Sequence, residues 1–250
     1  MNKNLILIRH GQSEWNKLNL FTGWKDVDLS EQGMQEASQA GKALLEYNIE
    51  PEICFTSFLK RAIKTLNIVL DTMDLDYLPV YKTWRLNEKH YGQLQGLNKQ
   101  ETAAKYGDEQ VLKWRRVFDC RPPALEDNDK RNPKNEKRYK DIPPKDLPVT
   151  ESLKDCIDRC MPYFNEIILP EFQKHNTILI SAHGNSLRGI VKNLKNMSEE
   201  EIIKFNIPTG IPYLFVFNEN LTLKEDKFLA DPQTVKKLME QVANQGSAKK

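Results

Sequence analysis

The sequence predicts an α/β fold in which a mostly parallel central sheet is flanked by helices on both faces. Two observations support this fold class. Short unbroken apolar runs alternate along the chain with stretches whose apolar residues recur at helical spacing. The length of 250 residues suits one such domain. No internal repeat or linker interrupts the pattern, so we expect residues 1–250 to form a single domain.

The strand candidates are apolar runs that are too short for helices. Such runs are typical of strands that are buried on both faces of a sheet. In chain order they are residues 5–8, 53–56, 78–81, 176–181 and 213–217.

Helix candidates lie between these strands. Ser30 is a suitable N-cap, and Glu31 places negative charge in the first turn of a helix that runs to about residue 47. Because strands alternate with helices, neighbouring strands are expected to run parallel. The other helix candidates are residues 59–70, 98–118 with a break near Gly107, 153–168 and 185–194.

Two segments depart from this alternation. Residues 119–150 contain six of the 13 prolines and 15 charged side chains. This composition predicts an irregular insertion, because proline lacks the N–H that helices and central strands need. Residues 241–250 are polar and end in Ser-Ala-Lys-Lys, and we expect a mobile C-terminal tail there.

The charges of the chain nearly cancel, because 37 Lys and Arg face 35 Asp and Glu for a formal net charge of +2. Proteins that bind nucleic acid or anionic membranes usually carry an excess of base, so we expect neither partner. An anion site would need positive charge gathered locally. The apolar run near the N-terminus is too short for a signal peptide or a membrane span, and the four cysteines form no C-x-x-C pair. We therefore expect a cytoplasmic protein with reduced, packing cysteines.

Two predicted strands lead into similar short sequences. The first is followed by Arg9-His10-Gly11, and the run at 176–181 leads into His183-Gly184. Ligands of open α/β sheets bind outside the carboxyl ends of the strands, so we expect the two histidines to meet in one crevice. The glycine after each histidine lets a ligand approach the backbone closely.

These residue types favour phosphoryl transfer over metal binding. Neither histidine has a third histidine or a carboxylate at zinc-like spacing, and Arg9 is a poor neighbour for a cation. A neutral imidazole is an available nucleophile at pH 7, and arginine presents a fork of donors that matches phosphate oxygens. Arg61, at the start of the helix after the second strand, is a candidate for the same crevice. Glu88, after the third strand, is a candidate proton shuttle.

An ordered set of sequence blocks is more specific than any of these single residues. The blocks are L-I-R-H-G-Q-S-E-W-N-K (7–17), F-T-G-W-K-D-V-D-L-S-E-Q-G (21–33), W-R-L-N-E-K-H-Y-G-Q-L-Q-G-L-N-K (84–99), W-R-R (114–116), S-A-H-G-N-S-L-R-G (181–189) and N-I-P-T-G-I-P (206–212). In this order, over about residues 5–246, they resemble the cofactor-dependent phosphoglycerate mutases of the histidine phosphatase superfamily. The resemblance implies a phosphoglycerate mutase-like form of the α/β fold.

The resemblance also assigns roles to residues of this chain. His10 resembles the nucleophile that carries the phosphoryl group, and His183 the second histidine that helps bind it. Arg9 and Arg61 would hold the phosphoryl oxygens, and Glu88 would act as general acid and base. The remaining matches form a substrate pocket of Ser13, Asn16, Thr22, Gly23, Tyr91, Gly184 and Asn185, with a basic group of Lys89, Lys99, Arg115 and Arg116.

The implied activity is an isomerase of glycolysis and gluconeogenesis that interconverts 3-phosphoglycerate and 2-phosphoglycerate. The phosphoenzyme would donate to one hydroxyl to form 2,3-bisphosphoglycerate, which is both primer and intermediate, and no metal is required. Bisphosphoglycerate mutase and phosphatase activities are expected side reactions. The expected partners are small phosphorylated glycerates, and family members are often homodimers or homotetramers. In the family the C-terminal tail, here ending in Lys249 and Lys250, is part of a cover over the site.

The chain departs from the family pattern at a few positions. Lys89 stands where arginine is usual, which keeps the charge but loses the bidentate fork. Gln12 replaces the usual glutamate, and Leu20 stands where a basic residue is common. Gly23 occupies a position where related bisphosphoglycerate mutases carry serine, and it favours the glycolytic mutase.

Two alternatives are weighed against this interpretation. A histidine-type phosphatase of the same superfamily would share both histidines, Glu88 and two arginines, but would not be expected to carry the long 98–150 segment with its basic residues. A non-catalytic scaffold with the same fold would have no need of both histidines.

Overall fold

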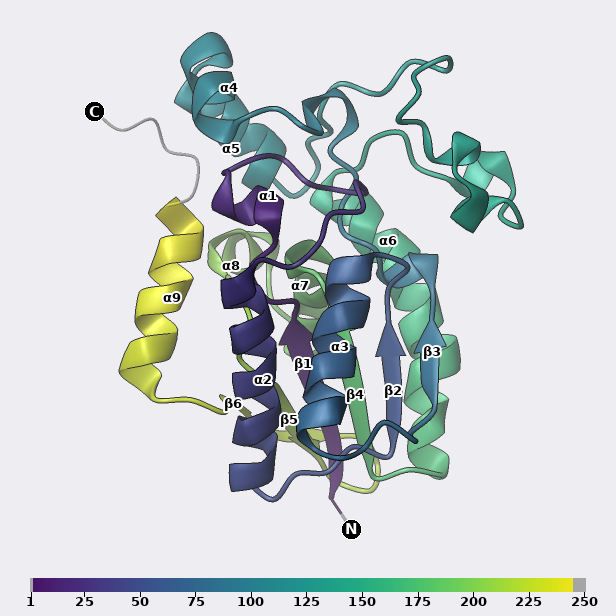
Figure 1. The fold of residues 1–250 in the computed structure, drawn as a ribbon, viewed down its shortest axis with the longest axis vertical. Coiled ribbons are helices and arrows are strands. Elements are labelled where there is room, and N and C mark those ends of the chain that lie inside the picture. The colour runs from purple at the N-terminus through teal and green to yellow at the C-terminus, as the bar shows by residue number, and fades with distance from the viewer. Residues whose placement is uncertain (1, 245–250) are drawn as a thin grey trace.

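The computed structural model of the chain describes residues 2–244, and a six-stranded sheet lies at its centre (Figure 1). The strand order is β3-β2-β4-β1-β5-β6. Neighbours from β3 to β1 run parallel, whereas β5 and β6 add antiparallel pairs at the other edge, which confirms a mostly parallel sheet. The bounds are β1 Lys3–Arg9, β2 Ile53–Thr56, β3 Val80–Lys82, β4 Thr177–Ala182, β5 Tyr213–Phe217 and β6 Leu223–Phe228.

The register of the two central strands brings the predicted histidines together. β1 pairs with β4 in parallel, with Arg9 opposite Ala182. The backbone N–H of His10 then donates to the carbonyl oxygen of Ala182 at 3.0 Å. Since His10 and His183 are the next residues along the two strands, both leave the sheet at the same carboxyl edge.

Helices cover both faces of the sheet, as predicted, with one pair in front of it and another pair behind it in the view of Figure 1. The front pair is α2 (Glu31–Glu46) and α3 (Lys60–Thr72), and the other pair is α6 (Leu153–Tyr163) and α7 (Gly184–Leu194).

Successive side chains of a strand point to opposite faces of the sheet, so the strands contribute to a hydrophobic core on each face. On β1, Leu5 and Leu7 pack into the core shared with α6 and α7, whereas Ile6 and Ile8 pack into the core shared with α2 and α3. All four side chains are fully buried. This two-sided burial explains why the strands appear in the sequence as unbroken apolar runs.

Two short helices and the insertion extend beyond the carboxyl edge of the sheet (Figure 1). Gly107, with a φ of 87°, separates α4 (Lys99–Tyr106) from α5 (Asp108–Arg116), at the predicted break. Residues 119–150 contain three short 3-10 turns and neither an α-helix nor a strand.

Four of the described α-helices and strands lie outside the sequence prediction. The helices α1 (Glu14–Lys17) and α8 (Glu199–Lys204) are too short to show periodicity, and β6 is a charged edge strand. The fourth is α9 (Pro232–Asn244), which is at the left of the view in Figure 1. Residues 241–244 of the expected tail continue this helix, and residues 245–250 lie outside the described part. Over residues 2–244, no helix is long and apolar enough to cross a lipid bilayer.

Candidate active site

His10, directly after β1, has one ring nitrogen that carries no proton. Its Nδ1 lies 2.7 Å from the carbonyl oxygen of Gly11, and Arg61 Nε donates to its Nε2 at 3.2 Å. Because a carbonyl only accepts and a guanidinium only donates, the ring proton is on Nδ1 and the lone pair is on Nε2. Burial, together with the charges of Arg61 and Arg9, lowers the pKa of His10 well below its ordinary value. His10 is therefore a neutral imidazole whose Nε2 is nucleophilic.

Arg61 is positioned by backbone carbonyls of a neighbouring loop. Its Nη1 donates to the carbonyl oxygen of Lys25 at 2.9 Å, and its Nη2 to that of Gly23 at 2.8 Å. Gly23 has a φ of 52°, and a Cβ there would lie 3.2 Å from the backbone nitrogen of Tyr91. Since all these acceptors are uncharged, Arg61 keeps its charge available for an anion beside His10.

Arg9 lies across the N-terminus of α7. Its Nη1 donates to the carbonyl oxygen of Ile207 at 2.9 Å, while its buried Nε has no partner among the described residues. Gly184 lies against this side chain, and a Cβ at that position would lie 3.4 Å from Arg9 Nε, in van der Waals contact. A buried N–H donor without an acceptor destabilises the folded protein unless a ligand supplies the acceptor. Arg9 Nε is therefore a candidate donor to a bound anion.

His183 caps α7 and faces His10, as the two strand ends predict. The ring centroids are 5.0 Å apart in an edge-on arrangement. His183 Nε2 lies 2.7 Å from Ser57 Oγ. Burial and the charge of Arg61 lower the pKa of His183 well below its ordinary value, so this ring is also neutral.

Glu88 reaches the N-terminus of α7 from the loop after β3. Its Oε1 accepts from the backbone N–H of Lys89 at 2.7 Å and from that of Asn185 at 3.1 Å. Trp24 Nε1 donates to the Glu88 carbonyl oxygen at 2.6 Å and fixes the backbone. With Oε1 held in this way, Oε2 is the carboxylate oxygen left for proton exchange.

A buried ion pair supports the segment that carries Glu88. Arg159 of α6 contacts Glu151 through bonds of 2.6 and 2.9 Å. Arg159 also donates to the carbonyl oxygens of residues 84, 85, 87 and 88, and Glu151 accepts from the backbone N–H of His90. A network whose members are all bonded holds its backbone rigidly. Neither residue stands out in the sequence, where each is an ordinary charge.

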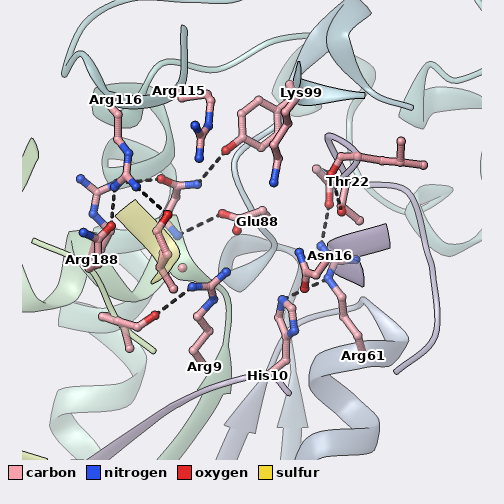
Figure 2. Close-up of a pocket in the computed structure, with 18 residues that line it drawn as sticks. Arg9, His10, Asn16, Thr22, Arg61, Glu88, Lys99, Arg115, Arg116 and Arg188 are labelled. Carbon is pink, nitrogen blue, oxygen red and sulfur yellow. Dashed lines mark hydrogen bonds between the residues drawn. The ribbon is translucent and has the colours of Figure 1, made fainter. Parts of the chain in front are cut away.

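Cationic side chains from α4 and α5 line the pocket opposite His10 (Figure 2). Lys99 begins α4, and burial, with Arg115 and Arg9 nearby, lowers its pKa to about 7. Arg116, at the end of α5, donates to Asn206 Oδ1 and to the carbonyl oxygen of Val242 in α9. This side of the pocket is therefore connected to the C-terminal helix.

Arg188 is a pocket residue that the sequence prediction omits. Its Nη1 donates to Asn185 Oδ1 at 3.0 Å and its Nη2 to the carbonyl oxygen of Ile202, while its buried Nε has no partner in the described part of the chain. Arg188 follows Gly184 by four residues on α7, so the helical repeat within S-A-H-G-N-S-L-R-G is the signal that indicates it. Leu20, Asn206, Ile207 and Val242 also line the pocket without having been predicted.

Positive charge is concentrated in the pocket, although the net charge of the chain is close to zero. Its lining holds six cationic side chains and one carboxylate, in a chain whose formal net charge is +2. Within residues 2–244, no cluster of three or more His, Cys, Asp or Glu is placed to hold a metal ion. The arrangement suits a small polyanion with one phosphoryl group at His10.

Known proteins are similar to this sequence over nearly its whole length. Residues 5–131 and 125–222 match the histidine phosphatase superfamily (branch 1). A Bacteroides fragilis protein named 2,3-bisphosphoglycerate-dependent phosphoglycerate mutase is 59% identical over 247 residues, which cover 99% of this chain and 100% of that protein. The chain belongs to the phosphoglycerate mutase family of the histidine phosphatase superfamily.

Other relatives agree with this membership. A Dichelobacter nodosus protein with the same name is 60% identical over 243 residues, which cover 97% of this chain and 99% of that protein. Among solved structures, "Mycobacterial hydrolase 1" superposes with a TM-score of 0.69 at 20% identity, covering 92% of this chain and 100% of that one. The alpha-ribazole phosphatase of Shigella flexneri has a TM-score of 0.64 at 22% identity, covering 88% and 94%. Likeness at such low identity shows the fold alone.

Most of the residues that the phosphoglycerate mutase resemblance singled out line the pocket, and three do not. Ser13 and Lys89 do not line the pocket: Ser13 caps α1 and bonds Asn16, and Lys89 Nζ donates to the carbonyl oxygen of Trp114 at 2.7 Å. His183 lies just beneath the lining, against the ring of His10. The predicted residues that do line it are Arg9, His10, Asn16, Thr22, Gly23, Arg61, Glu88, Tyr91, Lys99, Arg115, Arg116, Gly184 and Asn185.

Proposed function

We propose that this protein is a 2,3-bisphosphoglycerate-dependent phosphoglycerate mutase that interconverts 3-phosphoglycerate and 2-phosphoglycerate. The observation that carries the proposal is the state of His10, whose proton-free Nε2 lies 3.2 Å from Arg61 Nε in a pocket of six cations. The names of curated relatives at 59% identity support the choice of substrate.

In the proposed reaction His10 Nε2 attacks a phosphorus atom of 2,3-bisphosphoglycerate. The P–N bond forms as the P–O bond to glycerate breaks, and Glu88 gives its proton to the leaving oxygen. In the opposite direction Glu88 takes the proton of a glycerate hydroxyl, whose oxygen attacks the phosphoryl group while the P–N electron pair returns to Nε2. Arg9 and Arg61 hold the phosphoryl oxygens throughout, because their charge offsets that of the transferring group.

The remaining cations would hold the part of the substrate that does not react. Lys99, Arg115, Arg116 and Arg188 line the pocket away from His10 and suit a carboxylate and a second phosphate. Because positive charge surrounds the pocket, 2,3-bisphosphoglycerate can turn without leaving and present its other phosphate to His10. We also propose that the enzyme works in the cytoplasm as a homodimer or homotetramer, as the family resemblance implies.

One assay tests the proposed function. The purified protein receives 3-phosphoglycerate with a catalytic amount of 2,3-bisphosphoglycerate, and 2-phosphoglycerate is compared with free phosphate. We expect 2-phosphoglycerate as the main product, with activity that depends on the primer and survives EDTA. Mainly free phosphate would instead identify a histidine-type phosphatase, and a requirement for manganese would contradict the mechanism.

A further inference from the structure

The two ring nitrogens of His183 have different surroundings. Nε2 lies 2.7 Å from Ser57 Oγ, whereas the buried Nδ1 has no hydrogen-bond partner among the described residues. Ser57 follows β2, whose Thr56 pairs with Ser181 near the end of β4, so the fold places the serine next to His183. Both side chains are fully buried, and water does not compete for these atoms.

The other bond of Ser57 indicates which way its hydroxyl points. Ser57 Oγ accepts the backbone N–H of Leu59 at 3.1 Å. A hydroxyl has one proton to donate, and within residues 2–244 the only acceptor recorded for it is His183 Nε2. Donation to Nε2 gives the hydroxyl proton a partner, and the proton of the neutral ring is then on Nδ1.

We propose that Ser57 is a positioning residue that holds His183 as the Nδ1–H tautomer, so that this ring donates a hydrogen bond to the phosphoryl group moving to or from His10. The proposal rests on the proposed function. In the opposite tautomer Nδ1 would present a lone pair to an anion, which is repulsive where the transition state needs a donor. Ser57 thus acts through His183, much as a group that orients a catalytic base fixes its tautomer.

Nitrogen-15 NMR of the histidine rings tests the tautomer without any assay of activity. The chain has only four histidines, and the His183→Gln variant identifies the His183 signals by their loss. In the wild-type protein we expect Nδ1 to be the protonated nitrogen and Nε2 the bare one. In Ser57→Ala we expect a mixture of tautomers or the Nε2–H form. A proton on Nε2 in the wild-type protein would overturn the proposal, even if no variant folds.

Transient kinetics tests the consequence for catalysis. We expect Ser57→Ala to slow the phosphorylation of His10 by 2,3-bisphosphoglycerate at least tenfold, with binding of that compound changed less than twofold. Ser57→Thr keeps the hydroxyl and should recover most of the rate and the Nδ1–H signature. Ser181→Ala is the matched control, because Ser181 is equally buried and its Oγ donates to the carbonyl oxygen of Ala62 at 3.0 Å without touching either histidine.

The outcomes separate this inference from the proposed function. If the wild-type protein forms no phosphohistidine from 2,3-bisphosphoglycerate, the proposed function fails. If it does, but Ser57→Ala reacts as fast as Ser181→Ala or keeps the proton on Nδ1, only the role of Ser57 is refuted.

Discussion

The two sides of the pocket are built in different ways. The floor, which we define as Arg9, His10, Arg61 and His183, stands at the carboxyl edge of the sheet, and each of its side chains is at most 9% exposed. The roof, which we define as Lys99, Arg115 and Arg116, comes from α4 and α5, beyond that edge (Figure 2).

The bonds of the two sides differ in the same way. Floor side chains are fixed by carbonyls and by each other, as the bonds of Arg61 to Gly23, Lys25 and His10 illustrate. The roof is joined to the C-terminal helix, because Arg116 donates to the Val242 carbonyl oxygen at 3.2 Å. The difference indicates a division of labour, with rigid chemistry on the floor and substrate binding on the roof.

Loss of the nucleophile on the floor should have the largest effect. We expect His10→Ala to reduce kcat by on the order of 10⁴-fold or more, because the variant lacks the nitrogen that forms the covalent intermediate. His175→Ala is the control, since His175 is a partly exposed side chain between Glu52 and Glu171. Circular dichroism should show an intact fold for both variants. More than a trace of mutase activity in His10→Ala would disprove the phosphohistidine route.

A change in the roof should alter binding more than chemistry. We expect Arg116→Ala to raise KM about 30-fold, which is a loss of about 2 kcal/mol of charge-assisted bonding, with a smaller change in kcat. Lys113→Ala on the same helix should behave as wild type, because Lys113 is half-exposed and pairs with Glu109. If Arg116→Ala lowers kcat and leaves KM unchanged, the roof takes part in chemistry and the proposed division is wrong.

The sequence predicts the floor better than the roof, and the reason is local. His10 and His183 each follow a buried apolar run, so the carboxyl-edge rule of α/β sheets indicates their place. The pairing of β1 with β4, however, depends on strand order, which no local pattern determines. The roof cations look like ordinary helix-surface charges, and only the family resemblance singled them out.

Tertiary contacts explain what sequence reasoning could not reach. Arg188 and the Arg159–Glu151 pair owe their roles to packing between segments far apart in the chain. Lys89 illustrates the opposite case, since its place in a binding motif predicts a substrate contact but its Nζ donates to Trp114.

The pH dependence of binding should distinguish the roof from the floor. The pKa of Lys99 is lowered to about 7, mainly by burial and then by Arg115, so this amine loses its proton as pH rises above 7 in the free enzyme. A bound polyanion favours the charged amine, so binding above pH 7 should take up a proton. Affinity should then fall by up to about tenfold for each pH unit above 7, until the pKa of the complex is reached.

Calorimetry in buffers of different ionisation enthalpy measures this uptake. Lys99→Arg should abolish most of it, because arginine stays charged over the same range. An uptake that is unchanged in Lys99→Arg would assign the proton to another group, such as Lys89, whose pKa is lowered by burial to about 8.

The smallest expected effect concerns a side chain that links the loop after β3 to α5. Lys89 follows Glu88 in the chain, yet its buried ammonium donates to the Trp114 carbonyl oxygen in α5, next to Arg115. We expect Lys89→Met to raise KM about fivefold and leave kcat within about twofold, because an unpaired buried carbonyl costs about 1–3 kcal/mol and loosens the end of α5. Lys89→Arg keeps a donor at this position and should stay closer to wild type. Steady-state kinetics measures KM and kcat for both variants. An equal rise in KM in both would mean that the shape of the lysine side chain matters more than its hydrogen bond to Trp114. No change in either would mean that α5 holds the roof in place without the Lys89 side chain.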